Sequence, residues 1–379
     1  MEVRNKLNRL AENKQTFGSY SEKDVIFLLK DLSHFQLEGS VEAREQMIQG
    51  GQHYSETLPI EYQPPAEYLK VFWETLAEYK QKVALCTGVV SEQIYAQKGE
   101  NTVLVSLARA GTPVGVLIKR YLLENYQLDL PHYSISIIRD RGIDENAVRY
   151  ILKSHPGKSI QFIDGWTGKG AISIELTKAC KSFKEKYDIE LDDTLAVLAD
   201  PGHCTTLFGT REDFLIPSAC LNSTVSGLVS RTVLNQQLIG PEDFHGAKFY
   251  KEMLDDDVSN EYIKEITEQF PLILEEAKKN AQLLLQGDKE LPAFKGLQEV
   301  KRIAEEFAIS SLNYVKPGVG ETTRVLLRRV PWKILMKDPD SPFVKHILML
   351  AKERDVEVVH YPNMSYTCCG LIKKVGETK

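Results

Sequence analysis

Short apolar runs and helix-length segments alternate through the middle of the chain. Four apolar runs stand at 102–107, 133–138, 159–163 and 194–198, and segments long enough for a helix separate them. Strands with continuous apolar residues are buried on both faces, which is typical of a parallel sheet covered by helices on both sides. The pattern therefore predicts an α/β fold, in which ligands bind at the carboxyl ends of the strands.

Helical spacing of apolar residues dominates on either side of this core. The ranges 22–32 and 68–82 predict one helix each, and the ranges 261–285 and 294–310 predict a helical connector. After residue 314 the order becomes loop, helix, strand, helix and strand, which is enough for a compact domain of about 65 residues. We divide the chain into an N-terminal extension (1–75), an α/β core (76–240), a helical region (241–312) and a small C-terminal α/β domain (313–379).

Charge is unevenly spread between the C-terminal domain and the rest of the chain. The 379 residues carry a formal net charge of −6. Residues 314–379 hold 12 Lys and Arg against 7 Asp and Glu, whereas residues 1–313 hold 35 against 46. A basic module on an acidic body favours local contact with a polyanion, although a solvated basic surface has the same composition.

The sequence gives no sign of a membrane span or of an oxidising compartment. Residues 1–15 are charged and polar where a secretory signal is apolar, and no window approaches the roughly 18 apolar residues of a membrane span. Six cysteines are scattered without the paired spacing of a zinc site. We therefore expect reduced thiols, no bound structural metal and a cytoplasmic location.

Two glycine-containing loops each follow a predicted strand and lead into a helix. The loop 164–171 follows the strand 159–163, and the loop 108–113 follows the strand 102–107. Glycine lets backbone amides turn towards a phosphate, and a helix N-terminus adds partial positive charge. The candidate phosphate- and ribose-binding residues are Ala110, Gly111, Thr112, Gly165, Thr167, Gly168, Lys169 and Gly170.

Over residues 102–200 these loops resemble those of the type I phosphoribosyltransferases. The resemblance implies a parallel sheet with helices on both faces, phosphoribosyl pyrophosphate or a nucleotide as substrate, and magnesium bound with the pyrophosphate. It also implies catalytic roles for four residues. Arg109 has a planar fork that suits a pyrophosphate, and Asp164 would bind the ribose hydroxyls. Arg139 and Arg141 would lie in a mobile loop. The second loop has one acidic residue where that family has two.

Further segments of the chain carry a more specific resemblance, which covers nearly its whole length. These segments are Gly18–Tyr20, Asp24–Leu29, His53–Glu56, Ser136–Asp144, Phe162–Gly170 and Pro217–Thr232. They are similar to a bacterial family that accompanies tellurium-resistance and stress genes and that carries two labels, phosphoribosyltransferase and cysteine protease StiP. The resemblance implies a role in stress or tellurite resistance.

A cysteine protease needs a thiolate and a neighbouring base, and two cysteines are candidates for the nucleophile. Cys204 directly follows His203, and Cys220 lies in a later polar segment. A histidine from elsewhere in the sequence, such as His53 or His245, would have to approach in space. A buried packing role is the alternative for each cysteine.

Polar residues also gather after the last predicted core strand, where such sheets place a ligand crevice. They indicate a pocket for a base or a second phosphate, with a polar turn as the alternative. The candidate pocket residues are Ser218, Asn222, Ser226 and Arg231.

The start of the C-terminal domain carries a motif of its own. Gly318, Glu321, Thr323 and Arg324 match the Gly-x-Asn-Glu-x-Thr-Lys/Arg loop of the pelota-type RNA-binding domains, with Gly320 in place of the asparagine. The missing amide removes a base contact of about 1–3 kcal/mol, so the resemblance implies contact with the RNA backbone. A protein-docking domain is the alternative. The candidate RNA-binding residues are Lys316, Gly318, Gly320, Glu321, Thr323, Arg324 and Arg328.

Together these observations favour an enzyme that makes or breaks an N-glycosidic bond to a phosphorylated ribose and that carries an RNA-binding tail. Two other functions stay open, namely a cysteine protease that uses Cys204 or Cys220 and a non-catalytic regulator that senses a nucleotide and binds RNA. The expected partners are phosphoribosyl pyrophosphate or a nucleotide, and RNA, without a membrane. A homodimer is an open alternative.

Overall fold

A seven-stranded sheet forms the centre of the computed structural model, which describes residues 17–39, 47, 51–287 and 291–372. The strand order is β1-β6-β5-β8-β9-β10, with β7 added beside β6. Neighbouring strands run parallel except β6 and β7, which are antiparallel. The strands are β1 (Ile26–Phe27), β5 (Thr102–Ala108), β6 (His132–Ile138), β7 (Gly142–Ile143), β8 (Ser159–Trp166), β9 (Ala196–Ala199) and β10 (Leu207–Thr210).

Helices cover both faces of this sheet. Successive residues of a strand point to opposite faces, so Leu104 shares a core with α3, α4 and α8, whereas Val103 and Val105 share one with α5 and α6. Burial on both faces is why the strands read as continuous apolar runs. The helices of the core are α3 (Ala66–Lys98), α4 (Gly111–Tyr126), α5 (Glu145–Ser154), α6 (Ala171–Tyr187), α7 (Ser259–Thr267) and α8 (Phe270–Gln286).

The predicted helix at 22–32 is wrong, because the structure has two short strands there. Ile26–Phe27 pair with β6, and Lys30–Asp31, which form β2, pair with β11 (Gly246–Ala247). Val25, Leu28, Leu29 and Leu32 are buried by this arrangement. Pairing with distant strands has therefore overridden a local pattern that suits a helix.

Short elements complete the core. One further strand pair joins β3 (Glu38–Gly39) to β4 (Leu58–Pro59). The 3-10 turns are η1 (Tyr54–Glu56), η2 (Pro217–Cys220), η3 (Ser223–Val225) and η4 (Lys251–Asp256). The polar residues after β10 are therefore held in tight turns and not in an extended loop.

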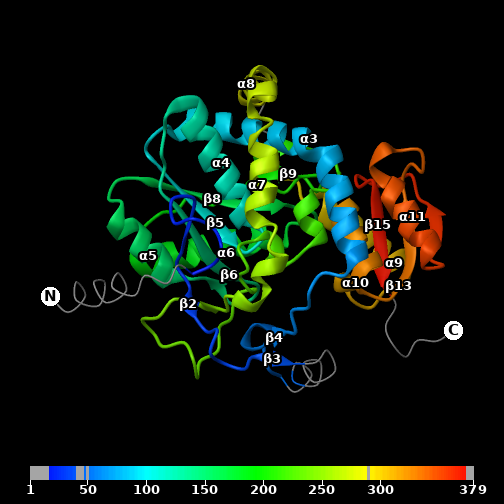
Figure 1. Ribbon diagram of the computed structural model, residues 1–379, viewed down its shortest axis with the longest axis horizontal. Helices are drawn as coiled ribbons and strands as arrows, with labels where there is room; N and C mark the ends of the chain where they lie inside the picture. The colour runs from blue at the N-terminus through cyan, green and yellow to red at the C-terminus, as the bar shows by residue number, and fades with distance from the viewer. Residues whose placement is uncertain (1–16, 40–46, 48–50, 288–290, 373–379) are drawn as a thin grey trace.

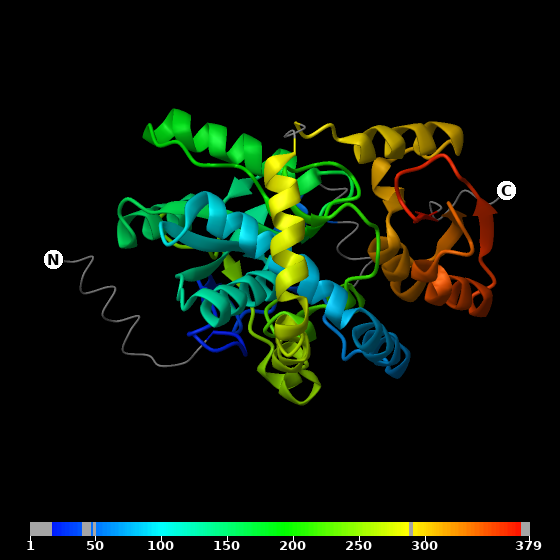
Figure 2. The same cartoon turned by 90° about the horizontal axis from the view of Figure 1, so that it is seen from above.

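A second, smaller sheet lies at one end of the molecule, in the orange to red part of Figures 1 and 2. Its order is β12-β15-β13-β14, and only β13 and β14 are parallel. The α9 helix packs on one face of this sheet, and α10 and α11 pack on the other, where they share a core with the main body. The elements are α9 (Lys295–Glu306), η5 (Leu312–Tyr314), β12 (Val315–Pro317), α10 (Val319–Arg328), β13 (Pro331–Met336), η6 (Pro342–Val344), α11 (Lys345–Glu353), β14 (Glu357–His360) and β15 (Cys368–Ile372).

The predicted α/β architecture with a mainly parallel sheet and a small C-terminal domain is confirmed, whereas its finer assignment to the phosphoribosyltransferase type is not. All four predicted core strands are present. The four-part division of the chain stays a prediction. The α3 helix crosses its boundary at 75/76, and α9 packs on the C-terminal sheet.

None of the described helices combines the length and the apolar character that a membrane crossing needs. Residues 1–15, on which the argument against a secretory signal depends, lie outside the described residues.

Candidate functional site

A cavity of about 270 Å³ lies at the carboxyl edge of the central sheet, between the core and the C-terminal domain. One wall is the segment 166–172, which connects β8 to α6. Arg139, just after β6, adds to the lining on the core side. The residues contributed by the C-terminal domain are Asn313, Lys316, Pro317 and Glu321. The cavity thus has the location expected for a ligand site in a parallel sheet.

Positive charge dominates the walls of this cavity. Lys169 donates a hydrogen bond from Nζ to the Leu312 carbonyl at 2.9 Å, and burial, followed by repulsion from Lys316, lowers its pKa to about 8. Lys316 is 3.6 Å from the carboxylate of Glu321. The adjoining α6 helix begins after Gly170, whose φ of +75° suits glycine. A helix N-terminus beside three cations favours an anionic or carbonyl-bearing ligand.

Cys204 lies directly behind the loop that forms this wall. Its thiol donates to the Gly168 carbonyl at 3.4 Å, and an added Cβ on Gly170 would stand 3.0 Å from its sulfur. The side chain is buried, and burial, followed by the charge of Asp200, raises the pKa of the thiol to about 12. The thiol is therefore neutral in this arrangement.

Asp200, the residue after β9, organises the turn that carries Cys204. Its carboxylate accepts hydrogen bonds from the backbone amides of Cys204 at 2.9 Å and Thr205 at 3.0 Å, and from the hydroxyl of Thr167. Arg211 forms an ion pair with the same carboxylate. Asp200 was not among the predicted site residues, although an acid directly after a buried strand is a signal for a site at the carboxyl edge.

The second candidate nucleophile, Cys220, has different surroundings. It lies in η2, is fully buried, and its thiol bonds Thr75 on α3, while Arg328 of α10 donates to its carbonyl. Burial raises the pKa of its thiol to about 12, although Arg328 and Arg324 favour the thiolate. It does not line the cavity described above.

The structure does not bring the two distant histidines to either cysteine. His245 pairs through Nδ1 with the Ser136 hydroxyl at 2.9 Å, and His53 pairs through Nδ1 with the Ser55 hydroxyl at 2.8 Å. Burial lowers the pKa of both imidazoles. Among the residues described, neither histidine is hydrogen-bonded to a cysteine thiol. His203 remains the histidine nearest to Cys204 in the chain, and both lie in the turn between β9 and β10.

The first glycine loop lies next to the second but does not line the cavity. Arg109 donates to the Val229 carbonyl at 3.1 Å and is 3.7 Å from the carboxylate of Glu61. A Cβ on Gly111 would stand 2.4 Å from the Ile163 carbonyl oxygen, so the loop packs directly on β8. Thr112 pairs through its hydroxyl with Ser134 at 2.8 Å, and Ala110 precedes α4. Protein groups fill the space where a pyrophosphate was expected.

Two of the other residues with predicted catalytic roles are engaged outside the cavity. Asp164 lies within β8 and accepts a hydrogen bond from the Gly165 amide at 2.8 Å, and burial raises its pKa to about 7. Arg141 is 3.6 Å from the carboxylate of Glu56. Arg139, by contrast, lines the cavity, and its guanidinium lies 5.5 Å from the centre of the Tyr54 ring.

The polar residues predicted as a base pocket tie distant segments together. Arg231 donates to the carbonyls of Tyr54 and Thr57 at 2.6 and 2.9 Å. Ser226 donates to the Asn222 carbonyl at 2.8 Å, and the Asn222 side chain accepts from Arg324. Ser218, in η2, contacts the hydroxyl of Tyr262. These residues therefore hold separate segments of the chain together.

The pelota-like motif faces the core. Gly318 has a φ of +87° and precedes α10, and Gly320 lies against Ala219. Arg324 donates to the carbonyl of Ala219 at 3.0 Å, and Arg328 donates to the carbonyl of Cys220 at 2.6 Å. Within the motif, Thr323 pairs with His346 at 2.9 Å. Of the candidate RNA-binding residues, Lys316 and Glu321 line the cavity, whereas the arginines are occupied by the core.

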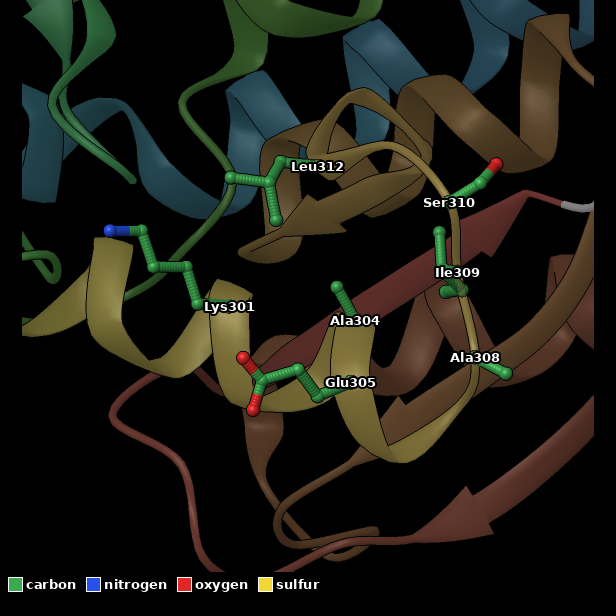
Figure 3. A pocket seen from close by; sticks show the side chains of 7 residues that line it. All are labelled: Lys301, Ala304, Glu305, Ala308, Ile309, Ser310 and Leu312. Atoms are coloured by element: carbon green, nitrogen blue, oxygen red, sulfur yellow. The ribbon is translucent and has the colours of Figure 1, made fainter.

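Another hollow, of about 340 Å³, lies between α9 and the segment 308–312 (Figure 3). Lys301 and Glu305 are its charged residues, and apolar side chains form much of the rest. It has neither a cysteine nor a histidine in its lining. Across the residues that the structure describes, three or more potential metal ligands do not cluster at any point.

Two family models match the chain. The model of the tellurite-like stress resistance cysteine protease StiP matches residues 18–267, and that of the PELOTA RNA binding domain matches residues 294–374. A curated relative named cysteine protease StiP, from Acinetobacter baylyi (strain ATCC 33305 / BD413 / ADP1), is 34% identical over 377 residues, which cover 96% of each chain.

These matches overturn the transferase hypothesis. The family and the curated relative are both named as a cysteine protease, so the predicted phosphoribosyltransferase activity and phosphoribosyl pyrophosphate binding are wrong. The roles given to Arg109, Arg139, Arg141 and Asp164 lose the basis on which they were inferred. The links to stress resistance and to a pelota-type domain agree with the matches. The chain belongs to the StiP family and carries a PELOTA RNA-binding domain towards its C-terminal end.

Proposed function

We propose that this chain is a cysteine peptidase whose nucleophile is the thiol of Cys204. The choice of Cys204 depends on one observation, which is the position of its sulfur. The sulfur lies directly behind the glycine loop that lines the cavity at the carboxyl edge of the sheet. The curated relative, which matches over nearly its whole length, is named as a cysteine protease. Cys220, the last residue of η2, is fully buried and does not line this cavity.

The proposed reaction needs a base for the thiol and a cradle for the substrate carbonyl. The thiolate forms a bond to the peptide carbonyl carbon, the C–N bond breaks, and the amine leaves with the proton that the thiol gave up. Water then cleaves the thioester and restores the thiol. His203, next to the nucleophile, is our candidate for the base, and the backbone amides of the segment 168–171 are candidates to stabilise the oxyanion.

Because the Cys204 thiol is buried and its pKa is raised to about 12, the described arrangement is a resting form. A peptide cannot reach the buried sulfur of Cys204 until the groups packed around it move. Activity in the purified protein is therefore expected to be low before that movement.

The nucleophile is tested with Cys204→Ala and its matched control Cys220→Ala, assayed on a fluorescent casein conjugate. Cys204→Ala should abolish the hydrolysis that the wild-type chain shows, because no other group replaces the attacking sulfur. Cys220→Ala should keep most of the activity. Loss of activity in Cys220→Ala alone, with an unchanged circular dichroism spectrum, would move the nucleophile to Cys220. Full activity in both variants would remove the peptidase proposal.

We also propose that the C-terminal domain binds RNA. The support is the basic composition of residues 314–379 and the match of residues 294–374 to the PELOTA RNA binding domain. A fluorescence titration with a hairpin RNA tests this proposal. Magnesium binding and a homodimer stay predictions.

A further inference from the structure

The groups that cover Cys204 come from the C-terminal domain and from the start of α9, which packs on its sheet. The Tyr366 hydroxyl donates to the Gly168 carbonyl at 3.2 Å, which is the same carbonyl that accepts from the Cys204 thiol. Phe294 donates from its backbone amide to the His203 carbonyl at 3.0 Å, and its ring stands 2.7 Å from the place of a Cβ on Gly170. All of these covering groups lie within the part of the chain that matches the PELOTA model.

Two glycines, Gly202 and Gly296, allow the turn and the groups over it to pack backbone against backbone. A Cβ on Gly202 would stand 1.6 Å from the Gly168 oxygen, and a Cβ on Gly296 would stand 2.0 Å from the Tyr366 hydroxyl and 2.4 Å from the Gly168 oxygen. The Gly296 amide also donates to the Gly202 carbonyl at 3.1 Å. The contact leaves no room for a peptide beside the thiol.

The same docking engages two arginines that were predicted to bind RNA, Arg324 and Arg328, with groups of the core. Arg324 donates to the Ala219 carbonyl at 3.0 Å and to the Asn222 side chain at 3.2 Å, and Arg328 donates to the Cys220 carbonyl at 2.6 Å. Burial lowers the pKa of both guanidinium groups, that of Arg328 to about 10. Their hydrogen-bond partners are uncharged, whereas an RNA phosphate offers a charged, bidentate partner.

Release of the domain does not require a sheet to be broken. The small sheet is built from strands within residues 315–372, and it shares no strand with the seven-stranded sheet. One side chain of the core, Asp213, holds the docked domain by accepting from the amides of Val319 at 2.9 Å and Thr367 at 2.8 Å. Release would expose the apolar side chains of α10 and α11 that pack against the main body, so RNA must bind the released form strongly enough to outweigh this burial.

We propose that docking of the C-terminal domain on the core and binding of RNA by α10 are mutually exclusive, so that RNA releases the domain and uncovers Cys204. The regulatory part of this inference rests on the proposed peptidase function, because it makes RNA the activator. By linkage, whatever weakens docking must strengthen RNA binding by the same factor.

The test uses the full chain, a hairpin RNA, and the rate at which iodoacetamide alkylates Cys204, read by peptide mass spectrometry. Saturating RNA should raise the rate about tenfold or more, whereas a DNA duplex of the same sequence should not. Cys180, which is buried in the core on the other face of the central sheet, serves as the internal control and should keep its low rate. An equal rise at Cys180 would mean general unfolding and would overturn the proposal.

Variants separate docking from RNA contact. Gly296→Ala should raise both the alkylation of Cys204 without RNA and the affinity for the hairpin, by similar factors. Tyr366→Phe removes one hydrogen bond and should act in the same direction with a smaller effect. Gly287→Ala is the matched control for alkylation, because its Cβ would make only an ordinary 3.4 Å contact with the Leu283 carbonyl oxygen at the end of α8.

The outcomes distinguish this inference from the proposed function. RNA that binds without any change at Cys204, or a Gly296→Ala variant with unchanged RNA affinity, overturns the coupling. Failure of the hairpin to bind either the wild-type chain or Gly296→Ala also overturns it. Uncovering of Cys204 by RNA without casein hydrolysis would leave the coupling intact and remove the peptidase proposal.

Discussion

The two glycine loops that follow β5 and β8 both connect a strand to a helix, but they have different surroundings. In the first loop Arg109 is bound by Val229 and Glu61, and Gly111 touches the backbone of β8. The second loop lines a cavity, carries Lys169, and covers Cys204. The difference shows that a glycine between a strand and a helix is explained either by close packing or by an open site, and that only the space around it distinguishes the two.

The largest effect in this comparison is expected from Gly111→Ala. The new Cβ would stand 2.4 Å from the Ile163 carbonyl oxygen, which belongs to a central strand and cannot move aside. We expect the free energy of unfolding to fall by about 3 kcal/mol, measured by urea denaturation. The matched control is Gly165→Ala on the neighbouring strand, where the nearest atom is 3.6 Å away. Equal stabilities of the two variants would contradict the packing explanation.

A smaller effect is expected from Arg109→Met. The change leaves the buried carboxylate of Glu61 without its nearest cation, and we expect a loss of about 2 kcal/mol at pH 7. Burial raises the pKa of Glu61, but Arg109 and two hydrogen bonds from Ser223 outweigh it, so the pKa is lowered overall. This stabilisation is present above the ordinary pKa of a glutamate and is lost as the pH falls through the lowered pKa of Glu61. The free energy of unfolding of Arg109→Met should therefore change less with acid pH than that of the wild-type protein.

Lys169→Met provides the counterpart in the second loop. Lys169 bonds a carbonyl oxygen and is repelled by Lys316, so its loss should change the stability by only about 0.5 kcal/mol in either direction. A loss as large as that of Arg109→Met, in the same denaturation experiment, would mean that both loops are structural.

A stability effect that depends on pH is expected from Asp164→Asn. Burial raises the pKa of Asp164 to about 7, so the unfolded chain releases this proton at a lower pH than the folded chain does. The wild-type protein should therefore lose stability between about pH 4 and pH 7, and the variant should be more stable at pH 8 by about 1 kcal/mol or more. The difference is measured as the urea midpoints of the wild-type protein and of Asp164→Asn across this pH range. Midpoints that change with pH in the same way in both proteins would contradict a raised pKa at Asp164.

Much of the fold follows from the spacing of apolar residues, whereas the function does not. The four core strands are long and apolar enough to be recognised alone. The strands β1 and β2 are not, because their pairing with β6 and β11 depends on residues more than 100 positions away. A strand, a glycine loop and a helix occur in α/β proteins of many functions, so the pattern supported a transferase hypothesis that the family matches overturn.

The candidate site was also only partly predictable. Cys204 and the segment 165–170 were identified from the sequence, but their cover by Phe294 and Tyr366 joins segments that lie far apart in the chain. Arg324 was recognised as part of an RNA-binding motif, yet its contacts with the core depend on how the domain docks. Local sequence identifies chemical groups, and tertiary packing decides which of them a ligand can reach.

The position of β15 has a consequence for the order of events during protein synthesis. This strand pairs with both β12 and β13, so the small sheet has no centre until residues 368–372 have left the ribosome. The strands of the large sheet all precede residue 211 and are available much earlier. A nascent chain can therefore form the Cys204 turn before its cover exists, and the thiol is most open to substrates and to oxidation during translation.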